Sequence, residues 1–268
     1  MVRVAHLERQ AALIGGLEGR DLSGRNLKGM NLSKANLKGV NLSKANLEGA
    51  ILKGADLSGA DLKGAYLKGA NLEEANLEEA ILDGATLMGA NLKRAYLKEA
   101  SMAVATMNGC DLEEADLEGA NLLGANLTGA TMDTANGRYA NLRAAELTGC
   151  QIDNCNFEGA FFDGANLSDV SIKSSSLKNS QLNEADLTDA KIEDTYLDGA
   201  SLTETNCTNA SLILCSLMKT DFSQAVLLGT NFMQSYFLYT KLEGSSYNNQ
   251  TYFPIVLTQA ELQSMTKV

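Results

Sequence analysis

The chain has 268 residues and a formal net charge of −11, with one His, no Trp, a single Pro and 24 Gly. This acidic balance argues against direct binding to nucleic-acid phosphates. The lone imidazole, His6, leaves no second His for a multi-His metal site, and any Ser/His/Asp triad or Cys/His dyad would have to be built around a residue near the terminus. The sequence therefore predicts no enzyme, with no catalytic residues, no cofactor and no metal.

No stretch approaches the roughly 20 apolar residues that a membrane-spanning helix requires, and the N-terminus lacks the profile of a signal peptide. We expect a protein without a membrane partner that resides in the cytoplasm. The periplasm or an organelle lumen is the alternative if a targeting segment has been removed.

Residues 1–16 are predicted to form a short amphipathic helix. Val4, Leu7, Ala11 and Ile14 recur at steps of three and four residues, which places them on one face of a helix. We expect this helix to cover the start of the repeat that follows, and His6 to lie on or beside it.

From Leu17 to Leu242 the sequence repeats every five residues. Positions whose numbers end in 2 or 7 hold Leu, Ile, Met or Phe, except Gly137 and Cys207, over 46 consecutive pentapeptides without an insertion. Positions ending in 0 or 5 are mostly Ala, and those ending in 1 or 6 are commonly Asn or Asp. Of the 24 glycines, 21 stand at numbers ending in 4 or 9, where a type II turn requires a positive φ.

A strict period of five fits neither an α-helix nor an ordinary strand, because a 3.6-residue period drifts off its face and a 2.0-residue period alternates faces. If the Leu and Ala positions point inward and a turn follows them, four pentapeptides close a square coil of 20 residues. Successive coils then stack at roughly 4.8 Å, and residue n contacts residue n+20. The repeat predicts an all-β solenoid of 11 to 12 coils.

The run Ala55–Gly64 (ADLSGADLKG) resembles the A(D/N)LxG consensus of the pentapeptide-repeat family, and the resemblance covers most of the chain. It implies a right-handed quadrilateral β-helix. Members of this bacterial, often cyanobacterial, family mostly have no assigned activity. Some resemble DNA and bind DNA gyrase, and gyrase-binding members dimerise through their C-terminal ends.

The stacking rule explains the exceptions in the core. Gly137 leaves a space that Phe157, one coil later, is predicted to fill, and Phe162 continues this bulkier segment. The five cysteines occupy inward positions, where we expect them to be buried free thiols that act as small apolar side chains.

Outward charges alternate in sign at 20-residue steps. The column at Glu78, Lys98, Glu118, Arg138, Glu158, Lys178 and Asp198 indicates a ladder of ion pairs that fixes the register, since like charges at strand spacing repel. Residues 1–70 carry a net charge of +5 and residues 71–268 carry −16. We take the following residues as a candidate acidic surface: Glu73, Glu74, Glu78, Glu79, Glu114 and Asp116.

Near the end of the repeat, apolar residues occupy positions predicted to face water. A large exposed apolar area implies a cover. Two alternatives for this cover remain open. Either residues 252 to 265 fold back over the apolar area, or a second protein chain covers it, which could be another copy or a different partner. The candidate interface residues are Ile213, Leu214, Met218, Val226, Leu228, Met233, Tyr236, Leu238 and Tyr239.

Thr258 to Glu261 has the spacing of a capping box and predicts a short helix from about Gln259 to Met265. The expected organisation is therefore a capping helix over 1–16, the repeat over 17–245 and a C-terminal cap over 246–268.

Two functional hypotheses follow. The first is a non-catalytic rigid scaffold that binds a protein partner of unknown identity, with a C-terminal homodimer as one form. The alternative is a DNA-mimicking protein that binds a topoisomerase such as gyrase and modulates it.

Overall fold

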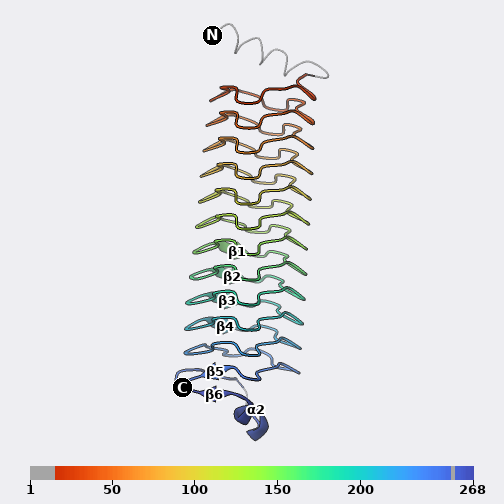
Figure 1. The fold of residues 1–268 in the computed structure, drawn as a ribbon. Coiled ribbons are helices and arrows are strands. Elements are labelled where there is room, and N and C mark those ends of the chain that lie inside the picture. Colours follow the sequence, from red (N-terminus) through yellow and green to blue (C-terminus); the bar gives the residue numbers. More distant parts are fainter. Residues whose placement is uncertain (1–15, 255–256) are drawn as a thin grey trace.

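A computed structural model describes residues 16–254 and 257–268. The chain forms a rod of stacked coils (Figure 1). Residue n pairs in parallel with residue n+20 from Asp21 and Asn41 to Val226 and Ser246, so each coil contains four pentapeptides. The rod is a right-handed quadrilateral β-helix, as predicted. The helix expected over 1–16 lies outside the described residues, apart from Gly16.

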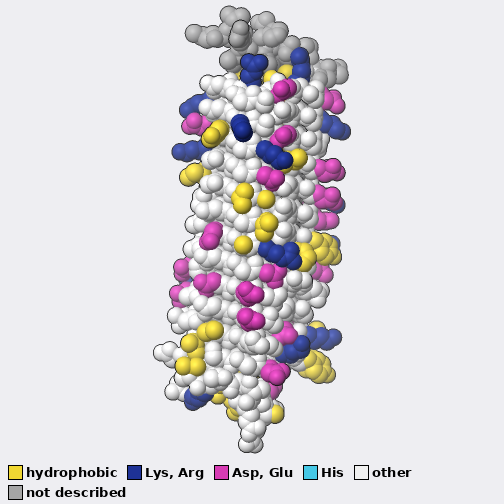
Figure 2. All heavy atoms as spheres, in the orientation of Figure 1, with side chains coloured by type: hydrophobic (Ala, Val, Ile, Leu, Met, Phe, Trp, Pro, Cys, Tyr) yellow, Lys and Arg dark blue, Asp and Glu magenta, His cyan; other side chains and the backbone are white. Residues whose placement is uncertain are grey.

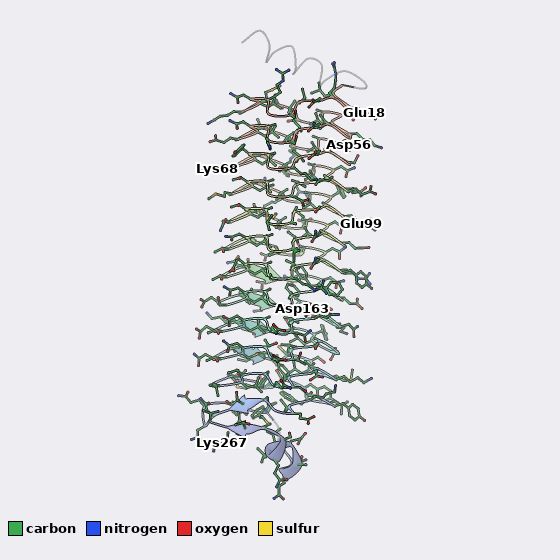
Figure 3. All side chains as sticks on the ribbon, viewed as in Figure 1. Glu18, Asp56, Lys68, Glu99, Asp163 and Lys267 are labelled. Atoms are coloured by element: carbon green, nitrogen blue, oxygen red, sulfur yellow. The ribbon has the colours of Figure 1, made fainter. Side chains whose placement is uncertain are left out.

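The rod has four sides, each one pentapeptide wide. We name them by their inward residues at 20-residue steps: face A contains Leu212, face B Leu217, face C Phe222 and face D Leu227. On every face the residue before the inward residue and the two residues after it point outward. Lys68 and Glu99 are examples of such outward side chains (Figure 3).

Few segments are long enough to count as strands, because a turn interrupts the chain every five residues. The parallel strands β1 (Gln151–Asp153), β2 (Ser171–Lys173), β3 (Lys191–Glu193) and β4 (Ser211–Ile213) form a sheet in that order on face A. Near the C-terminus, β5 (Ser246–Tyr247) pairs in parallel with β6 (Thr266–Lys267), and helix α2 (Gln259–Ser264) lies between them in sequence.

The core is a stack of inward Leu and Ala side chains. Most of them, such as Leu57 and Ala60, have no exposed surface. The predicted exception at Gly137 is also confirmed, since a Cβ added there would lie 2.0 Å from Cε1 of Phe157. The Phe157 ring therefore occupies the space left by the glycine, and it packs edge-on against Phe162 with ring centroids 5.6 Å apart.

The corners of the coils have left-handed backbone. All 46 positions from 19 to 244 whose numbers end in 4 or 9 have φ between +49° and +71°, and 25 of them are not glycine. Most corners are closed by a turn bond such as the one from Ala55 N–H to Leu52 O, 2.9 Å. Asn or Asp before the inward residue supports the turn, as when Asp61 Oδ1 accepts from Lys63 N–H at 3.0 Å.

Polar inward residues change the corner of face A beside β1–β4. The Cys155 N–H donates to Ser175 Oγ of the next coil (3.0 Å), and the Cys215 N–H donates to Ser235 Oγ (2.9 Å). These backbone donors are therefore satisfied by hydroxyls of the following coil. This replaces the usual turn bond and leaves the preceding three residues extended as strands.

The C-terminal tail closes the open end of the core. Asn231 pairs with Tyr252, and this places Phe253 in stacked contact with Phe232, with centroids 5.6 Å apart. Helix α2 has the predicted capping box between Thr258 and Glu261, but it ends at Ser264. The chain then leaves the helix to form β6 on the last coil.

We predict that Gly137→Leu lowers the free energy of unfolding by about 3 kcal/mol, because the new side chain and the Phe157 ring cannot share one space. Adding Phe157→Leu restores the ordinary repeat and should recover most of the loss. Urea unfolding of the two single variants and the double variant measures the coupling. Additive effects would contradict the packing.

We predict that Val104→Gly raises the free energy of unfolding by about 0.5 to 1 kcal/mol. Val104 is β-branched, has φ of +51° and is 65% exposed, so the change relieves backbone strain without opening the core. The reverse change Gly84→Val, at the same corner one coil earlier, should destabilise by a similar amount. Chemical unfolding of both variants tests the opposite signs.

Candidate functional site

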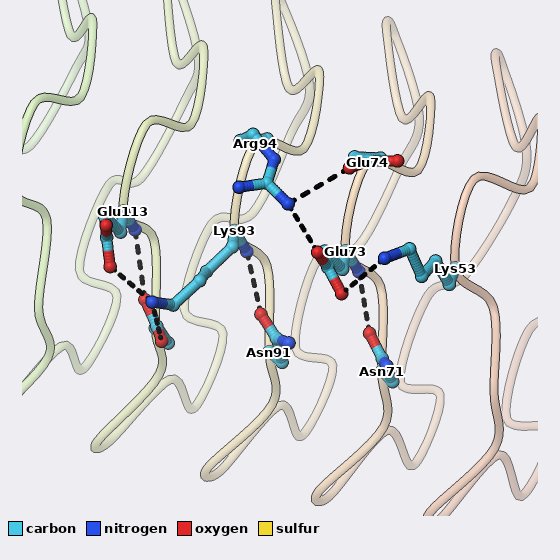
Figure 4. A network of polar contacts seen from close by, with 9 residues as sticks. Lys53, Asn71, Glu73, Glu74, Asn91, Lys93, Arg94 and Glu113 are labelled. Atoms are coloured by element: carbon cyan, nitrogen blue, oxygen red, sulfur yellow. Dashed lines mark hydrogen bonds and ion pairs between the residues drawn. The ribbon is translucent and has the colours of Figure 1, made fainter.

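At the N-terminal edge of the candidate acidic surface, the carboxylates belong to a network of ion pairs (Figure 4). Glu73 lies 3.0 Å from Lys53 Nζ and 2.5 Å from Arg94 Nη2, and Arg94 also pairs with Glu74 at 3.0 Å. The hydrogen bond from Lys53 lowers the pKa of Glu73, and the bond to Glu74 raises the pKa of Arg94. Glu73 and Glu74 are thus engaged by neighbouring cations in a network that links successive coils.

The other members of the acidic surface are spread over two faces. Glu114 lies beyond this network at the corner of face A, whereas Glu78, Glu79 and Asp116 lie on face B. Glu78 and Glu79 line a shallow, open polar depression together with Lys38 and Asp56. No group of three or more His, Cys, Asp or Glu residues in the described part of the chain is arranged to hold a metal ion.

On face B, three of the six steps in the predicted column of alternating charges form ion pairs. Lys98 pairs with Glu118 at 3.3 Å, Arg138 with Glu158 at 3.7 Å and Lys178 with Asp198 at 3.6 Å. The members of each pair are one coil apart. The ladder therefore links successive coils and neutralises part of the acidic charge.

On face A, three carboxylates in consecutive coils, Glu113, Asp133 and Asp153, interrupt the alternation of charge. Asp133 and Asp153 occupy consecutive coils on face A, and Asp153 Oδ1 is buried without a hydrogen-bond partner. Burial, followed by the nearby charge of Asp133, raises the pKa of Asp153. Ionisation of Asp153 therefore lowers the free energy of unfolding.

The net charge is unevenly divided along the rod. Residues 71–205 carry a net charge of −16, whereas residues 206–268 contain three basic and three acidic residues and are neutral. The candidate apolar residues all belong to the neutral part. A protein surface can therefore approach this end without the electrostatic field that surrounds the middle of the rod.

The nine candidate interface residues form a collar around three faces. Leu214, Met233, Tyr236 and Tyr239 are exposed, Tyr239 to 75%, and the others are half-buried. We call these nine residues the C-terminal collar. Face A contributes Ile213, Leu214 and Met233, and face D contributes Val226 and Leu228. Face B contributes Met218, Tyr236, Leu238 and Tyr239. The collar is therefore broader than the single patch that the sequence suggests.

The described residues of the tail pack on the end of the core and on face D, and four collar residues stay exposed. Phe253 packs on Phe232 and Phe237 at the end of the core, and β6 extends face D by pairing with β5. Of the two alternatives left open by the sequence, folding back of the tail does not cover Leu214, Met233, Tyr236 or Tyr239 with any residue that the structure describes.

Sequence reasoning missed a second exposed apolar area midway along the rod, on face C. Val104 is 65% exposed and Leu123 is 43% exposed. Hydrophobic side chains are visible both midway along the rod and near its C-terminal end (Figure 2). The available signal was Val104 itself, an apolar β-branched residue at a corner where glycine is preferred.

The five cysteines are buried free thiols, as expected. Burial raises the pKa of Cys110, Cys155, Cys207 and Cys215 to about 12 and that of Cys150 to about 11. Several thiols also donate to core carbonyls, such as Cys110 Sγ to Leu87 O at 2.9 Å. They remain protonated and are structural.

Among the described residues, no helix has the length and apolar character needed to cross a membrane.

The family model described as "Pentapeptide repeats" matches most of the chain in eight copies. The chain belongs to the pentapeptide repeat family. The matched residues are 21–54, 55–94, 95–133, 119–152, 145–183, 180–217 and 215–246. A comparison with curated proteins gave no match.

Several solved structures are pentapeptide repeat proteins similar to this chain. HetL, from the cyanobacterium Nostoc sp. strain PCC 7120 and involved in regulation of heterocyst differentiation, is 29% identical over 78% of this chain and 90% of its own, with a TM-score of 0.48. A trypsin-treated QnrB1, a plasmid-mediated fluoroquinolone resistance protein, is 20% identical over 68% and 89%, with a TM-score of 0.50. The QnrB1 likeness supports the fold alone.

We predict that Asp153→Asn stabilises this pentapeptide repeat protein at pH 7, because it removes a charge that folding disfavours. The folded pKa is raised, so the wild type loses stability as the pH rises from the unfolded pKa to the folded pKa. The gain should vanish as the pH falls below the ordinary value of 3.8. Thermal unfolding from pH 3 to pH 7 tests it, and a gain independent of pH would contradict this cause.

Proposed function

We propose that the protein is a non-catalytic rigid scaffold that mediates protein–protein interaction, with the C-terminal collar as its main contact surface. The observation that carries the proposal is the location of nine apolar residues at the neutral C-terminal end of the rod, next to its acidic middle. Exposed apolar surface of this kind is typical of interaction sites.

The rest of the rod supports a scaffold. Backbone bonds join each coil to the next from Leu17 onward, and the repeat runs without a loop insertion that would build a deep pocket. A stack of coils that contact only their neighbours holds its surface groups at fixed spacing. A partner therefore meets a preformed surface and loses little free energy to ordering it.

A topoisomerase such as gyrase is a second candidate partner, through mimicry of DNA by the acidic middle. The net charge of −16 over residues 71–205 favours it. The ion-pair ladder weighs against it, because paired carboxylates do not present the unbroken negative charge of a phosphate backbone. Inhibition of gyrase supercoiling by the purified protein, reduced in Glu114→Gln/Asp116→Asn, would support this candidate over the first.

The C-terminal collar makes a sharp prediction about self-association. If a second copy covers it, Leu238→Glu should convert a dimer into a monomer, because a charge would enter an apolar interface. The fold tolerates Glu at this position, since Glu78, Glu118 and Glu158 occupy the same column. Light scattering of the intact protein and the variant measures the mass.

Leu123→Glu, an exposed position on face C, is the control and should leave the mass of a dimer formed through the collar unchanged. A monomer in every case that is destabilised by Leu238→Glu would contradict self-association. It would leave a different protein as the partner of the collar.

A further inference from the structure

Face C has an uncharged and partly apolar area midway along the rod. Val104 is 65% exposed and Leu123 is 43% exposed, and Ala103 precedes Val104 in the same coil. From Gly84 to Asn141, no outward residue of this face carries a charge. Exposed apolar surface of this kind is typical of a contact site.

The stability of a single rod does not account for Val104. Its φ of +51° lies in the left-handed region, which a β-branched side chain disfavours, and most of its surface is exposed. Its Cγ1 lies 3.4 Å from the point where a Cβ on Gly124 of the next coil would stand. The valine therefore extends the apolar area of face C out to the corner.

Charged residues flank this area on both sides along the rod. They are Lys44, Lys63 and Asp83 toward the N-terminus, and Arg143, Asp163 and Glu184 toward the C-terminus. Arg143 and Asp163 pair with each other at 3.0 Å, and Asp163 is labelled in Figure 3. Lys44, Lys63 and Glu184 form no ion pair with another residue that the structure describes. Their charges are therefore available to a second molecule.

A second copy of the rod matches this order of charges. When two rods meet through face C about a two-fold axis perpendicular to their length, each column opposes the same column of the partner in reverse order. We place the axis between the coils that hold Ala103 and Leu123. The opposed charges are then Lys44 with Glu184, Lys63 with Asp163, and Asp83 with Arg143. The symmetry forms each pair twice.

Only this register opposes all six charges to opposite charges. Sliding one rod by one coil opposes Lys63 to the partner's Arg143, and sliding it the other way opposes Asp83 to the partner's Asp163. Opposed like charges disfavour a contact. Sliding by two coils in either direction leaves Lys63 opposite an uncharged residue. The order of charges therefore selects one antiparallel arrangement.

The corner column of face C also fits itself in this register. Val104 opposes the partner's Gly124, and Ala144 opposes the partner's Gly84. Each side chain thus meets a position without a side chain, and glycine allows a close approach of backbone. The two faces can therefore come into contact along the whole uncharged area.

We infer that the protein forms an antiparallel homodimer through face C, with Val104 and Leu123 at its centre and the six charges on its flanks. The contact extends from Ser23 to Thr203, nine coil steps or about 43 Å. Face C holds none of the collar residues, so the dimer presents two collars that face other proteins. The pairing goes beyond the proposed function and does not depend on it.

The test measures the mass of the full chain by analytical ultracentrifugation over a concentration series at low ionic strength. The intact protein should be a dimer that weakens as salt is added, because salt screens exposed charges. Leu123→Glu places two carboxylates beside the two-fold axis and should abolish the dimer. A monomer at every concentration of the intact protein would overturn the inference.

The outer charges test the register. Lys44→Glu and Glu184→Lys each oppose two pairs of like charges and should weaken the dimer about tenfold. Both residues are exposed at corners, where Lys34 and Glu74 show that either charge is accommodated. The double variant restores opposite charges and should recover the affinity of the intact protein. Losses that add in the double variant would overturn the antiparallel register.

Val104→Gly separates contact from folding. It should stabilise the rod, because it relieves backbone strain, and yet weaken the dimer by several-fold, because it removes apolar surface at the centre. No general loss of structure produces this combination. An unchanged dimer affinity would overturn the apolar centre of the contact.

Leu238→Glu on face B is the matched control, and it should leave the face C dimer intact. If Leu238→Glu lowers the mass and Leu123→Glu does not, the second copy lies on the collar and the face C dimer is overturned. The proposed function would stand in that case. Loss of the dimer in Leu123→Glu alone supports face C and leaves the collar to a different protein.

Discussion

The pairing of each residue with the residue 20 positions later is the constraint on which the structure depends. It makes one coil from four pentapeptides, and it holds from Asp21 to Ser246 because no insertion interrupts the repeat. Every side chain therefore belongs to a column that runs along the rod. Columns of Leu and Ala form the core, whereas columns of alternating charge connect successive coils. The same register that stabilises the rod also sets the spacing of everything it presents to other molecules.

The register is maintained at a cost in backbone conformation. Each of the 46 corners is left-handed, and 25 of them carry a side chain that disfavours this geometry. Turn bonds, Asn and Asp side chains and inter-coil bonds offset the cost. At the face A corner beside β1–β4, the Cys155 N–H donates to Ser175 Oγ of the next coil and the three preceding residues extend into a strand. At this one corner, inward hydroxyls thus alter the turn without opening the stack.

Charge and apolar surface divide the rod into parts with different capacities. The acidic middle is crossed by ion pairs and attracts basic surfaces over a distance. The neutral end exposes tyrosines and aliphatic side chains, among them Leu214, Tyr236 and Tyr239. Because the tail is engaged in closing the core through Phe253, it leaves the C-terminal collar exposed. In the function that we propose, long-range attraction and contact with the partner would therefore involve different coils of the rod.

The sequence alone determined the period, the inward and outward positions, the filling of Gly137 by Phe157, the charge columns and the capping box at Thr258, because each follows from residue type at a fixed spacing. The tertiary structure decided what lies outside that spacing. Asn231 pairs with Tyr252, a step of 21 residues that the repeat does not contain, and this single extra residue brings Phe253 over the core. The exposure of Leu123 and the unpartnered oxygen of Asp153 likewise depend on neighbours from other coils. The five-residue period specifies the column in which each side chain lies. The exposure of a side chain, and the path of the chain at the ends of the rod, depend instead on the contacts with neighbouring coils.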